Sequence, residues 1–434
     1  MVYCTTMLPN PCDTISVPNS RHRSPYFFMI SRFRQAWNEY PRQFWLLFFG
    51  MLFSTIGTSM IWPFLMIYLT ETLNVKLTTA TSLMSLNAGM GLVSSFIAGA
   101  ITDKLGRKWV MVISLAMVGL VNIFMSQANT LVAFAILMGI QGTFNPLYRV
   151  AADAMVSDLI PQEKRIDAYS LLRMANNTGI ALGPSIGGFV AASSYTTAFL
   201  IASAGLLLYS LAVMIFGRET LPERASTGEK VMERFGGYGR VLGNLKYMRF
   251  IGAVTLTSIS ASIMWVLLSV YAKGNYGVTE SQYGPIPTTN ALMVVLLQVA
   301  ITAIFKRFNP LMVMAGGAFL YAVGTGSVGF GQGFWWFWMS MVIMTFGELL
   351  LVPTSSTYAA NMAPPDMRGR YMSIYSLTWG IATGLGPLFA GFMGDHFGPQ
   401  VIWWTAGAAG LLSTLAFLGL RQKETRLERE AVPG

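Results

Sequence analysis

Twelve long runs of apolar residues, separated by short polar stretches, organise the 434-residue chain. They cover residues 43–70, 78–102, 109–128, 130–158, 166–193, 197–216, 249–273, 284–306, 311–331, 333–362, 370–394 and 400–420. Each run has about the 20 residues that an α-helix needs to cross the hydrocarbon core of a bilayer. The pattern therefore predicts an all-α membrane protein with twelve transmembrane helices.

Composition and charge placement agree with a polytopic membrane protein. The chain is 53% hydrophobic and only 11% charged, although its net charge is +10. With the N-terminus in the cytoplasm, 25 of the 29 Lys and Arg residues lie on the cytoplasmic side. The positive-inside rule thus predicts that both the N- and C-termini are cytoplasmic. The basic excess reports this topology and not a nucleic-acid partner.

A polar stretch in the middle of the chain divides the spans into six and six. We expect a six-helix bundle over 43–216, a cytoplasmic linker over 217–248 and a second six-helix bundle over 249–420. Cytoplasmic tails then cover 1–42 and 421–434. The long linker without a membrane-length run is typical of a boundary between two domains.

The two halves are related by a shift of 203 residues. It places Pro161 on Pro364, Gly183-Pro184 on Gly386-Pro387, and Gly188-Phe189 on Gly391-Phe392. Parallel repeats of six spans are a transporter architecture, with the substrate site between the halves near the bilayer midplane. The sequence therefore predicts two six-helix pseudo-repeats.

A charged loop joins the second and third spans and reads GAITDKLGRK. Its notable residues are Gly99, Asp103, Lys104, Gly106, Arg107 and Lys108. Asp103 and Arg107 are four residues apart and can face the same side of a helical turn, and Asp158 is the nearest further acid for Arg107. The bases alone could be topogenic charges, but that interpretation explains neither the aspartate nor the glycine. The 203-residue shift carries Arg107 to Pro310, so the signature is one-sided.

This loop is similar to the loop 2–3 signature of the major facilitator superfamily. A second set, Gly179, Gly183, Pro184, Gly187 and Gly188, looks like the fifth-span motif of its drug:proton antiporter branch. The resemblance implies the major facilitator fold, transport by alternating access, and a charge latch between loop 2–3 and the start of the eleventh span in the outward-facing state. Met138 stands where that branch has a fourth-span arginine, so a proton-coupling role is not carried over to this position.

The fifth-span glycines also have a structural interpretation of their own. Small residues four apart allow two helices to approach closely, and Pro184 bends its span because it removes a backbone donor. Export as the direction of transport is implied by the resemblance alone.

Glu348 is a candidate proton site because it lies deep in the tenth span. Burial disfavours the charged form of a carboxyl, so that its proton can be exchanged at physiological pH. The 203-residue shift places Glu348 opposite Asn145 in the first half. The alternative is a protonated carboxyl that bonds a neighbouring hydroxyl and serves packing alone.

Three further charged residues lie inside the fourth and fifth spans. Arg149 and Asp153 are four residues apart and can pair along one helix, whereas Arg173, near Asn177, has no acid on its own span. Arg173 is therefore a candidate cavity residue for an anionic or carbonyl-bearing substrate, unless it shares Asp153. Tyr68 and Tyr271 either line an apolar pocket or anchor their spans.

The favoured function is a secondary active transporter that exports small amphipathic molecules or drugs by alternating access, in exchange for protons. Alternatives are a sugar or peptide uptake transporter of the same fold and, more remotely, a non-transporting sensor or an enzyme. No phosphate-binding Gly-rich motif for ATP is present, and two His and two Cys predict neither a metal site nor another cofactor. We expect a monomer in the cell membrane, with a small-molecule substrate, protons and the lipid bilayer as partners.

Overall fold

The computed structural model describes residues 37, 39–221, 238–364 and 367–430. Nearly all of the predicted N-terminal tail, residues 222–237 of the linker and the last four residues lie outside this part of the chain. The described residues fold into helices and contain no strand.

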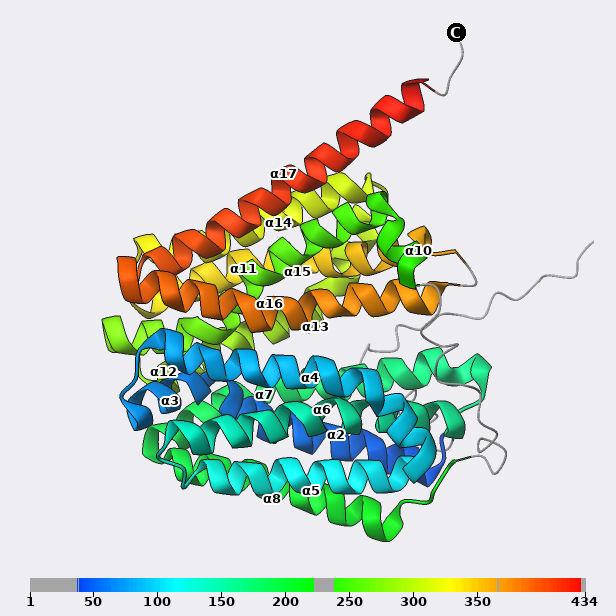
Figure 1. The fold of residues 1–434 in the computed structure, drawn as a ribbon, viewed down its shortest axis with the longest axis vertical. Coiled ribbons are helices and arrows are strands. Elements are labelled where there is room, and N and C mark those ends of the chain that lie inside the picture. Colours follow the sequence, from blue (N-terminus) through cyan, green and yellow to red (C-terminus); the bar gives the residue numbers. More distant parts are fainter. Residues whose placement is uncertain (1–36, 38, 222–237, 365–366, 431–434) are drawn as a thin grey trace, which may run out of the picture.

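Twelve long helices form two bundles that lie side by side (Figure 1). The first bundle contains α2 (Arg42–Ile61) continued by η1 (Trp62–Phe64) and α3 (Leu65–Leu73), α4 (Leu77–Leu105), α5 (Arg107–Met125), α6 (Leu131–Leu159), α7 (Arg165–Ser193) and α8 (Tyr195–Phe216). The second contains α11 (Leu245–Tyr276), α12 (Glu280–Tyr283) with α13 (Pro285–Phe305), α14 (Pro310–Ser327), α15 (Gly333–Met362), α16 (Arg368–Phe397) and α17 (Val401–Glu430). Short elements η2 (Gln162–Lys164), η4 (Val328–Phe330) and α10 (Tyr238–Gly243) lie between them. The predicted all-α architecture is confirmed.

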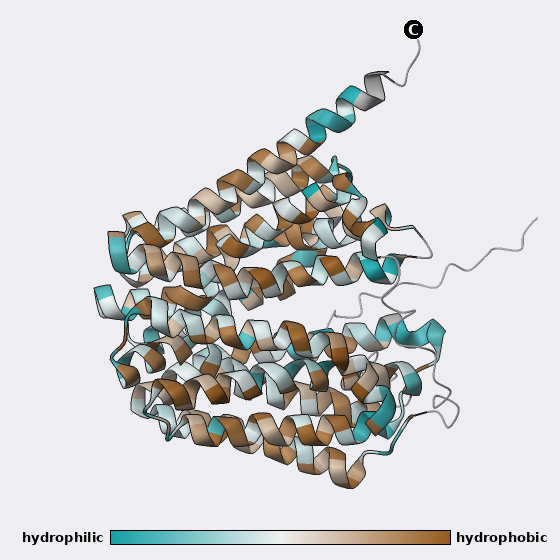
Figure 2. Ribbon diagram, in the orientation of Figure 1, coloured by the Kyte–Doolittle hydropathy of each residue, from teal (hydrophilic) through white to brown (hydrophobic). Residues whose placement is uncertain are grey.

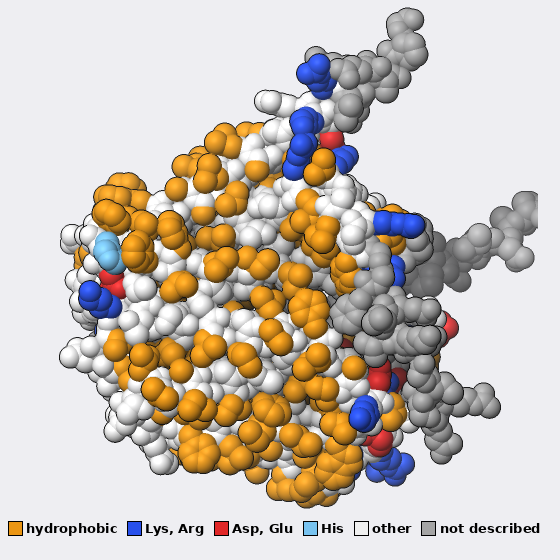
Figure 3. All heavy atoms as spheres, in the orientation of Figure 1, with side chains coloured by type: hydrophobic (Ala, Val, Ile, Leu, Met, Phe, Trp, Pro, Cys, Tyr) orange, Lys and Arg blue, Asp and Glu red, His pale blue; other side chains and the backbone are white. Residues whose placement is uncertain are grey.

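Ten spans are long and apolar enough to cross a membrane. The other two long helices, α7 and α16, hold the paired Gly-Pro motifs and several polar residues, which lower their hydropathy. Apolar side chains cover the flank of the molecule, and most charges gather at the two ends of the helices (Figures 2 and 3). This belt is the surface that a bilayer would cover.

The 203-residue repeat is seen in the helix boundaries themselves. The first span, Arg42–Leu73, corresponds to Leu245–Tyr276, the bounds of α11. In the same way Arg165–Ser193 corresponds to α16 within one residue. The packing repeats as well, because α2 packs on α7 and α8 as α11 packs on α16 and α17. The two halves thus share one fold.

The bundles meet through two equivalent helix pairs. Helix α4 of the first bundle packs on α16, and α7 packs on α12 and α13 of the second bundle. Since α4 corresponds to α12–α13 and α7 to α16, these interfaces are related by the same pseudo-symmetry. A pathway between the bundles therefore has α4, α7, α13 and α16 at its flanks.

Three details of the structure add to the predicted boundaries. Helix α17 continues to Glu430, so the predicted C-terminal tail begins as a polar helix that projects from the bundle (Figures 1 and 2). Residues such as Arg, Gln, Lys and Glu there are good helix formers. The second bundle begins at Leu245, because Asn244 caps α11 by accepting a hydrogen bond from the backbone N–H of Tyr247. The first span is interrupted by η1 at Pro63, which has no N–H to donate.

Candidate functional site

The charged loop at the cytoplasmic end of α4 forms a compact ion-pair network. The Arg107 side chain is 9% exposed; its Nη2 lies 3.2 Å from Asp103 Oδ1 and its Nε lies 3.0 Å from Asp158 Oδ2. Gly106 joins the two helices with φ +90°, a conformation that favours glycine. The sequence prediction that Arg107 pairs with Asp158 is confirmed.

Glu219, which the sequence analysis missed, completes this network. Its carboxylate accepts hydrogen bonds from the backbone N–H groups of Arg107 (2.9 Å) and Lys108 (3.2 Å) at the N-terminus of α5. An anion is stabilised there by the unpaired N–H groups and the helix dipole. Lys104 is exposed, and Lys108 Nζ lies 5.4 Å from the ring centroid of Trp109. The position of Glu219 after the last helix of the bundle gave no sequence signal for this role.

The expected contact between this loop and the start of α16 is not made in this structure. Asp158, Asp103 and Arg107 all belong to the first bundle, so their pairing does not cross the boundary between the halves. At the start of α16, the Tyr371 hydroxyl accepts a hydrogen bond from Asn244 within the second bundle. A Cβ added at Gly99 would meet no atom within 4 Å. At this position near its cytoplasmic end, α4 therefore has no close neighbour from the second bundle among the described residues.

The outer ends of the helices are, in contrast, closely packed across the boundary. Asp395 of α16 accepts hydrogen bonds from the backbone N–H of Leu77 (3.2 Å) and of Thr78 (2.7 Å) at the start of α4. The Ser85 hydroxyl donates to the carbonyl of Gly384. Among the described residues, the hydrogen bonds and ion pairs between the bundles all lie in this outer half.

A cluster of charged groups adds to the outer closure. Lys273 Nζ lies 2.6 Å from Glu71 Oε1 of the first bundle and 2.6 Å from Glu280 Oε1 of the second. The Tyr195 hydroxyl donates a hydrogen bond to the same oxygen of Glu280. With the termini in the cytoplasm, the hydrogen bonds and ion pairs that join the bundles among the described residues therefore lie toward the outside, as in an inward-facing arrangement.

The fifth-span glycines serve two interfaces of α7. A Cβ at Gly179, Gly183 or Gly187 would approach α2 too closely; at Gly187 it would lie 2.3 Å from the carbonyl oxygen of Met60. A Cβ at Gly188 would lie 2.4 Å from the carbonyl oxygen of Glu280, and the carbonyl of Pro184 faces Gly284. The predicted close approach is confirmed, and one face of the motif lies at the boundary between the bundles.

Glu348 lies in the second bundle with an amide as its partner. Asn290 Nδ2 donates to Glu348 Oε2 at 2.8 Å and lies 2.9 Å from the Thr345 hydroxyl. No Lys or Arg among the described residues lies within 4 Å of the carboxyl. Asn145, its counterpart under the repeat, is exposed on α6 and makes no hydrogen bond to Glu348. Asn290 was not among the residues predicted from the sequence. The signal that could have identified it is the 203-residue repeat, which places Asn290 on Asn87.

The predicted pairing of Arg149 with Asp153 is not formed. In the part of the chain that the structure describes, neither Arg149 nor Arg173 has a carboxylate oxygen within 4 Å. The side chains of Arg149, Asp153 and Arg173 are all exposed. Asn177 is partly buried one turn from Arg173. Arg149 does not need an ion pair with Asp153 where its charge can face water, because water then solvates the guanidinium.

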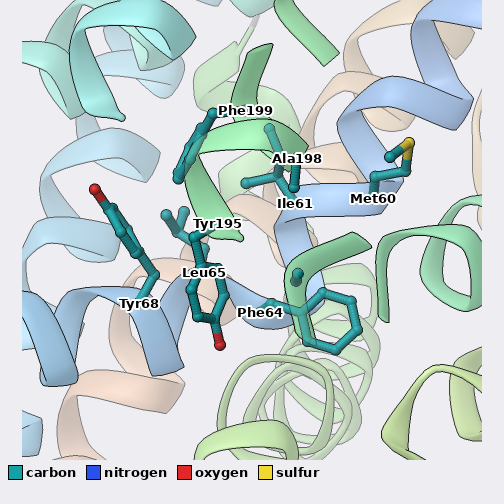
Figure 4. A pocket seen from close by; sticks show the side chains of 9 residues that line it. Met60, Ile61, Phe64, Leu65, Tyr68, Tyr195, Ala198 and Phe199 are labelled. Carbon is teal, nitrogen blue, oxygen red and sulfur yellow. The ribbon is translucent and has the colours of Figure 1, made fainter. Parts of the chain in front are cut away.

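A narrow pocket at the outer end lies inside the first bundle rather than between the bundles. Figure 4 shows that residues of α2, η1, α3 and α8 line it, among them Phe64, Tyr68 and Tyr195. The rings of Tyr68 and Tyr195 lie 5.3 Å apart, and Tyr68 donates to the carbonyl of Met125. Tyr271 is 2% exposed in the core of the second bundle and lines no pathway.

Comparison with known proteins decides the family. The model of the Major Facilitator Superfamily matches residues 47–249 and again residues 250–433. The chain belongs to the major facilitator superfamily. The two matches divide five residues after the start of α11, so that each match covers one bundle almost completely.

Relatives of this chain include a cation/proton antiporter and a drug-resistance protein. A Na⁺, Li⁺, K⁺/H⁺ antiporter of Planococcus maritimus is 26% identical over 85% of this chain and 93% of its own length. The quinolone resistance protein NorA of Staphylococcus aureus is 21% identical over 90% and 99%. These relatives fit the drug:proton antiporter branch. A solved POT family transporter, 18% identical, has a TM-score of 0.74 over 88% of this chain and 96% of its own, which supports the fold.

The chain is thus a multi-pass membrane protein of a transporter family, which is not an enzyme family. Among the described residues no group of three or more His, Cys, Asp or Glu side chains is placed to hold a metal ion.

Proposed function

We propose that this superfamily member is a secondary active transporter of the cell membrane that exports small amphipathic molecules in exchange for protons. The observation that carries the proposal is the environment of Glu348. Its carboxyl lies about 21 Å from the cytoplasmic end of α15, at 1.5 Å per residue, and is bonded by a neutral amide instead of a cation. A carboxyl in such a place can take up and release a proton, since no fixed positive charge holds it ionised.

The second oxygen of Glu348 has no protein partner among the described residues. Asn290 bonds only Oε2, and the residue as a whole is only partly buried. In the inward-facing arrangement, a proton has a route from Glu348 to the cytoplasmic side. The names of the sodium or potassium antiporter and of the quinolone resistance protein support an exchanger and an exporter, respectively.

Reconstitution of the full chain into liposomes tests the proposal. A pH gradient would be imposed across the membrane, and the flux of a panel of lipophilic cations, lipophilic anions, sugars and dipeptides would be followed. We expect amphiphile flux that a protonophore abolishes. Glu348→Gln should reduce gradient-driven flux at least about tenfold, as for loss of a proton-transfer group.

The exposed Glu163→Gln in the loop after α6 is the matched control and should retain full flux. A Glu348→Gln protein with undiminished gradient-driven flux would contradict proton coupling through this residue. Flux of sugars or dipeptides in place of amphiphiles would instead favour the uptake transporter.

A further inference from the structure

Two arginines of the first bundle stand out because they lie within membrane-spanning helices and neither forms a close ion pair among the described residues. Arg149 of α6 and Arg173 of α7 are both exposed, and neither has a carboxylate oxygen within 4 Å among the described residues. A guanidinium within a membrane-spanning helix is costly unless it faces a water-filled pathway or a partner. Their orientation decides which of these applies.

Both arginines lie on the sides of their helices that face away from lipid. Arg173 is nine residues before Leu182, which places the two on opposite sides of α7 at 100° per residue, and Leu182 is 47% exposed. Pro184, on the same side as Arg173, packs against Gly284 of the second bundle. The face of α7 that bears Arg173 is therefore the face that meets the other bundle farther out.

Helix α6 shows the same organisation. Asn145 is nine residues after Ile136, which is 59% exposed toward lipid, so Asn145 lies on the opposite, inner side. Arg149 follows one turn later, about 140° from Ile136. Both arginines therefore face the space between the bundles.

The polar residues of the two helices also lie in matching layers. Helix α6 ends at Leu159 and α7 begins at Arg165, so Arg149 and Arg173 lie about 15 and 12 Å from their cytoplasmic ends, at 1.5 Å per residue. Asn145 and Asn177 lie one turn deeper, at about 21 and 18 Å. A molecule that enters from the cytoplasm thus meets two guanidinium groups and then two amides, of which Asn145 lies at the level of Glu348.

We propose that the transported molecule carries an acidic group, such as a carboxylate, sulfonate or phosphate, on its apolar body, and that Arg149 and Arg173 bind this group. The proposal rests on the proposed export function and names its substrate class. Guanidinium groups form short, two-pronged hydrogen bonds with such oxygens. Asp153 balances only one of the two positive charges, so the inner pathway is net positive and repels a cation whenever Glu348 is protonated.

Binding to the purified full chain in a neutral detergent provides the direct test. The probes are 2-naphthoate and 2-naphthyltrimethylammonium, which share a ring and differ in charge, measured by titration calorimetry. We expect the carboxylate to bind more tightly. Arg149→Gln and Arg173→Gln should each weaken its affinity about tenfold, the loss of one charge-assisted hydrogen bond, with little effect on the cation.

Controls separate binding from folding. Arg240→Gln, which removes an exposed arginine of α10, should bind naphthoate as the unmodified protein does. Arg149→Lys and Arg173→Lys keep the charge and should recover part of the affinity. These lysine variants keep the test decisive if a glutamine variant has a lowered melting temperature.

The outcomes distinguish this proposal from the proposed function. Unchanged naphthoate affinity in both glutamine variants, or a preference for the cation, would overturn the anion site. If a pH gradient drives flux of 2-naphthyltrimethylammonium and the Arg149→Gln and Arg173→Gln proteins retain this flux, proton-coupled export is supported and the anion site is wrong. If arginine-dependent naphthoate binding occurs but no gradient drives flux, the anion site stands and proton exchange is wrong.

Discussion

Most helices of the N-terminal and C-terminal bundles begin and end at positions about 203 residues apart, yet the two bundles differ at most of the polar positions that concern function. Even the hydrogen bonds between the bundles are repeated. The Ser85 hydroxyl donates to the carbonyl of Gly384, and its counterpart Thr288 donates to the carbonyl of Ala181, the counterpart of Gly384. Helix packing is therefore a shared property of the two halves.

The polar residues inside the spans show the opposite behaviour. Arg149 corresponds to Val352 and Arg173 to Ser376, while Glu348 corresponds to Asn145. The first bundle thus holds the unpaired cations and the second holds the carboxyl. The comparison teaches that the repeat preserves the small and apolar residues on which packing depends, and that the chemistry of transport comes from the positions where the halves differ.

The largest expected effect concerns the one-sided network at Arg107. Arg107→Gln removes the cation that pairs with Asp158 and Asp103, and because only the arginine side of these pairs is buried we expect a loss of about 2 kcal/mol of unfolding free energy, between the values for exposed and buried pairs. Thermal unfolding of the purified protein in detergent would measure the loss. Lys306→Gln, at the equivalent loop of the other half, is exposed and should change the melting temperature little. Equal losses in both variants would mean that the loops do not differ.

The next effect concerns the close approach of α7 and α2. Gly187→Ala puts a methyl group 2.3 Å from the carbonyl oxygen of Met60, and overpacking of this kind costs about 2 kcal/mol. The counterpart in the second half is already Ala390, so only the first half should be sensitive. Gly316→Ala, where the new Cβ meets nothing within 4 Å, is the control and should be neutral or slightly stabilising. A stable Gly187→Ala protein would show that the helices separate without cost.

The two equivalent asparagines should differ in transport. Asn290→Leu removes the donor to Glu348, whereas Asn87→Leu removes only a donor to the carbonyl of Met138. For Asn290→Leu we expect about a tenfold lower rate of gradient-driven flux, which corresponds to the loss of about one hydrogen bond to a functional group. The pH dependence of flux should change as well. Asn87→Leu should stay close to the unmodified protein. The same loss of flux in both would point to a structural role for each.

The smallest effects concern the paired hydrogen bonds between the bundles. Ser85→Ala and Thr288→Val should each favour separation of the outer ends by about 1 kcal/mol. Thr288→Val should have the larger effect, because this hydroxyl also bonds Ser185 at 2.8 Å.

Distances between spin labels at Lys76 and Gln400, at the outer ends of α4 and α16, would report this separation once Cys4 and Cys12 are replaced by serine. An unchanged distance distribution in both variants would show that these bonds do not hold the outer side closed.

Much of the fold was predictable because membrane-length apolar runs and the 203-residue shift are local properties of the chain. The pairing of Arg107 with Asp158 also followed from spacing and the ends of two spans. The Arg149–Asp153 pair was predicted and is absent, since helical spacing permits a contact but does not select the rotamer. Asn290 was within reach through its counterpart Asn87, whereas Glu219 had no pattern to identify it.

The sequence by itself determined the number and length of the helices, the two-fold repeat, the orientation in the membrane and the presence of charged residues within the spans. Each follows from hydropathy and charge, which act on a segment whatever its neighbours are. Tertiary contacts alone establish that the outer ends of the bundles are joined, that Asn290 bonds Glu348 and that Glu219 caps α5. These depend on contacts between residues distant in the chain, and no local pattern encodes them.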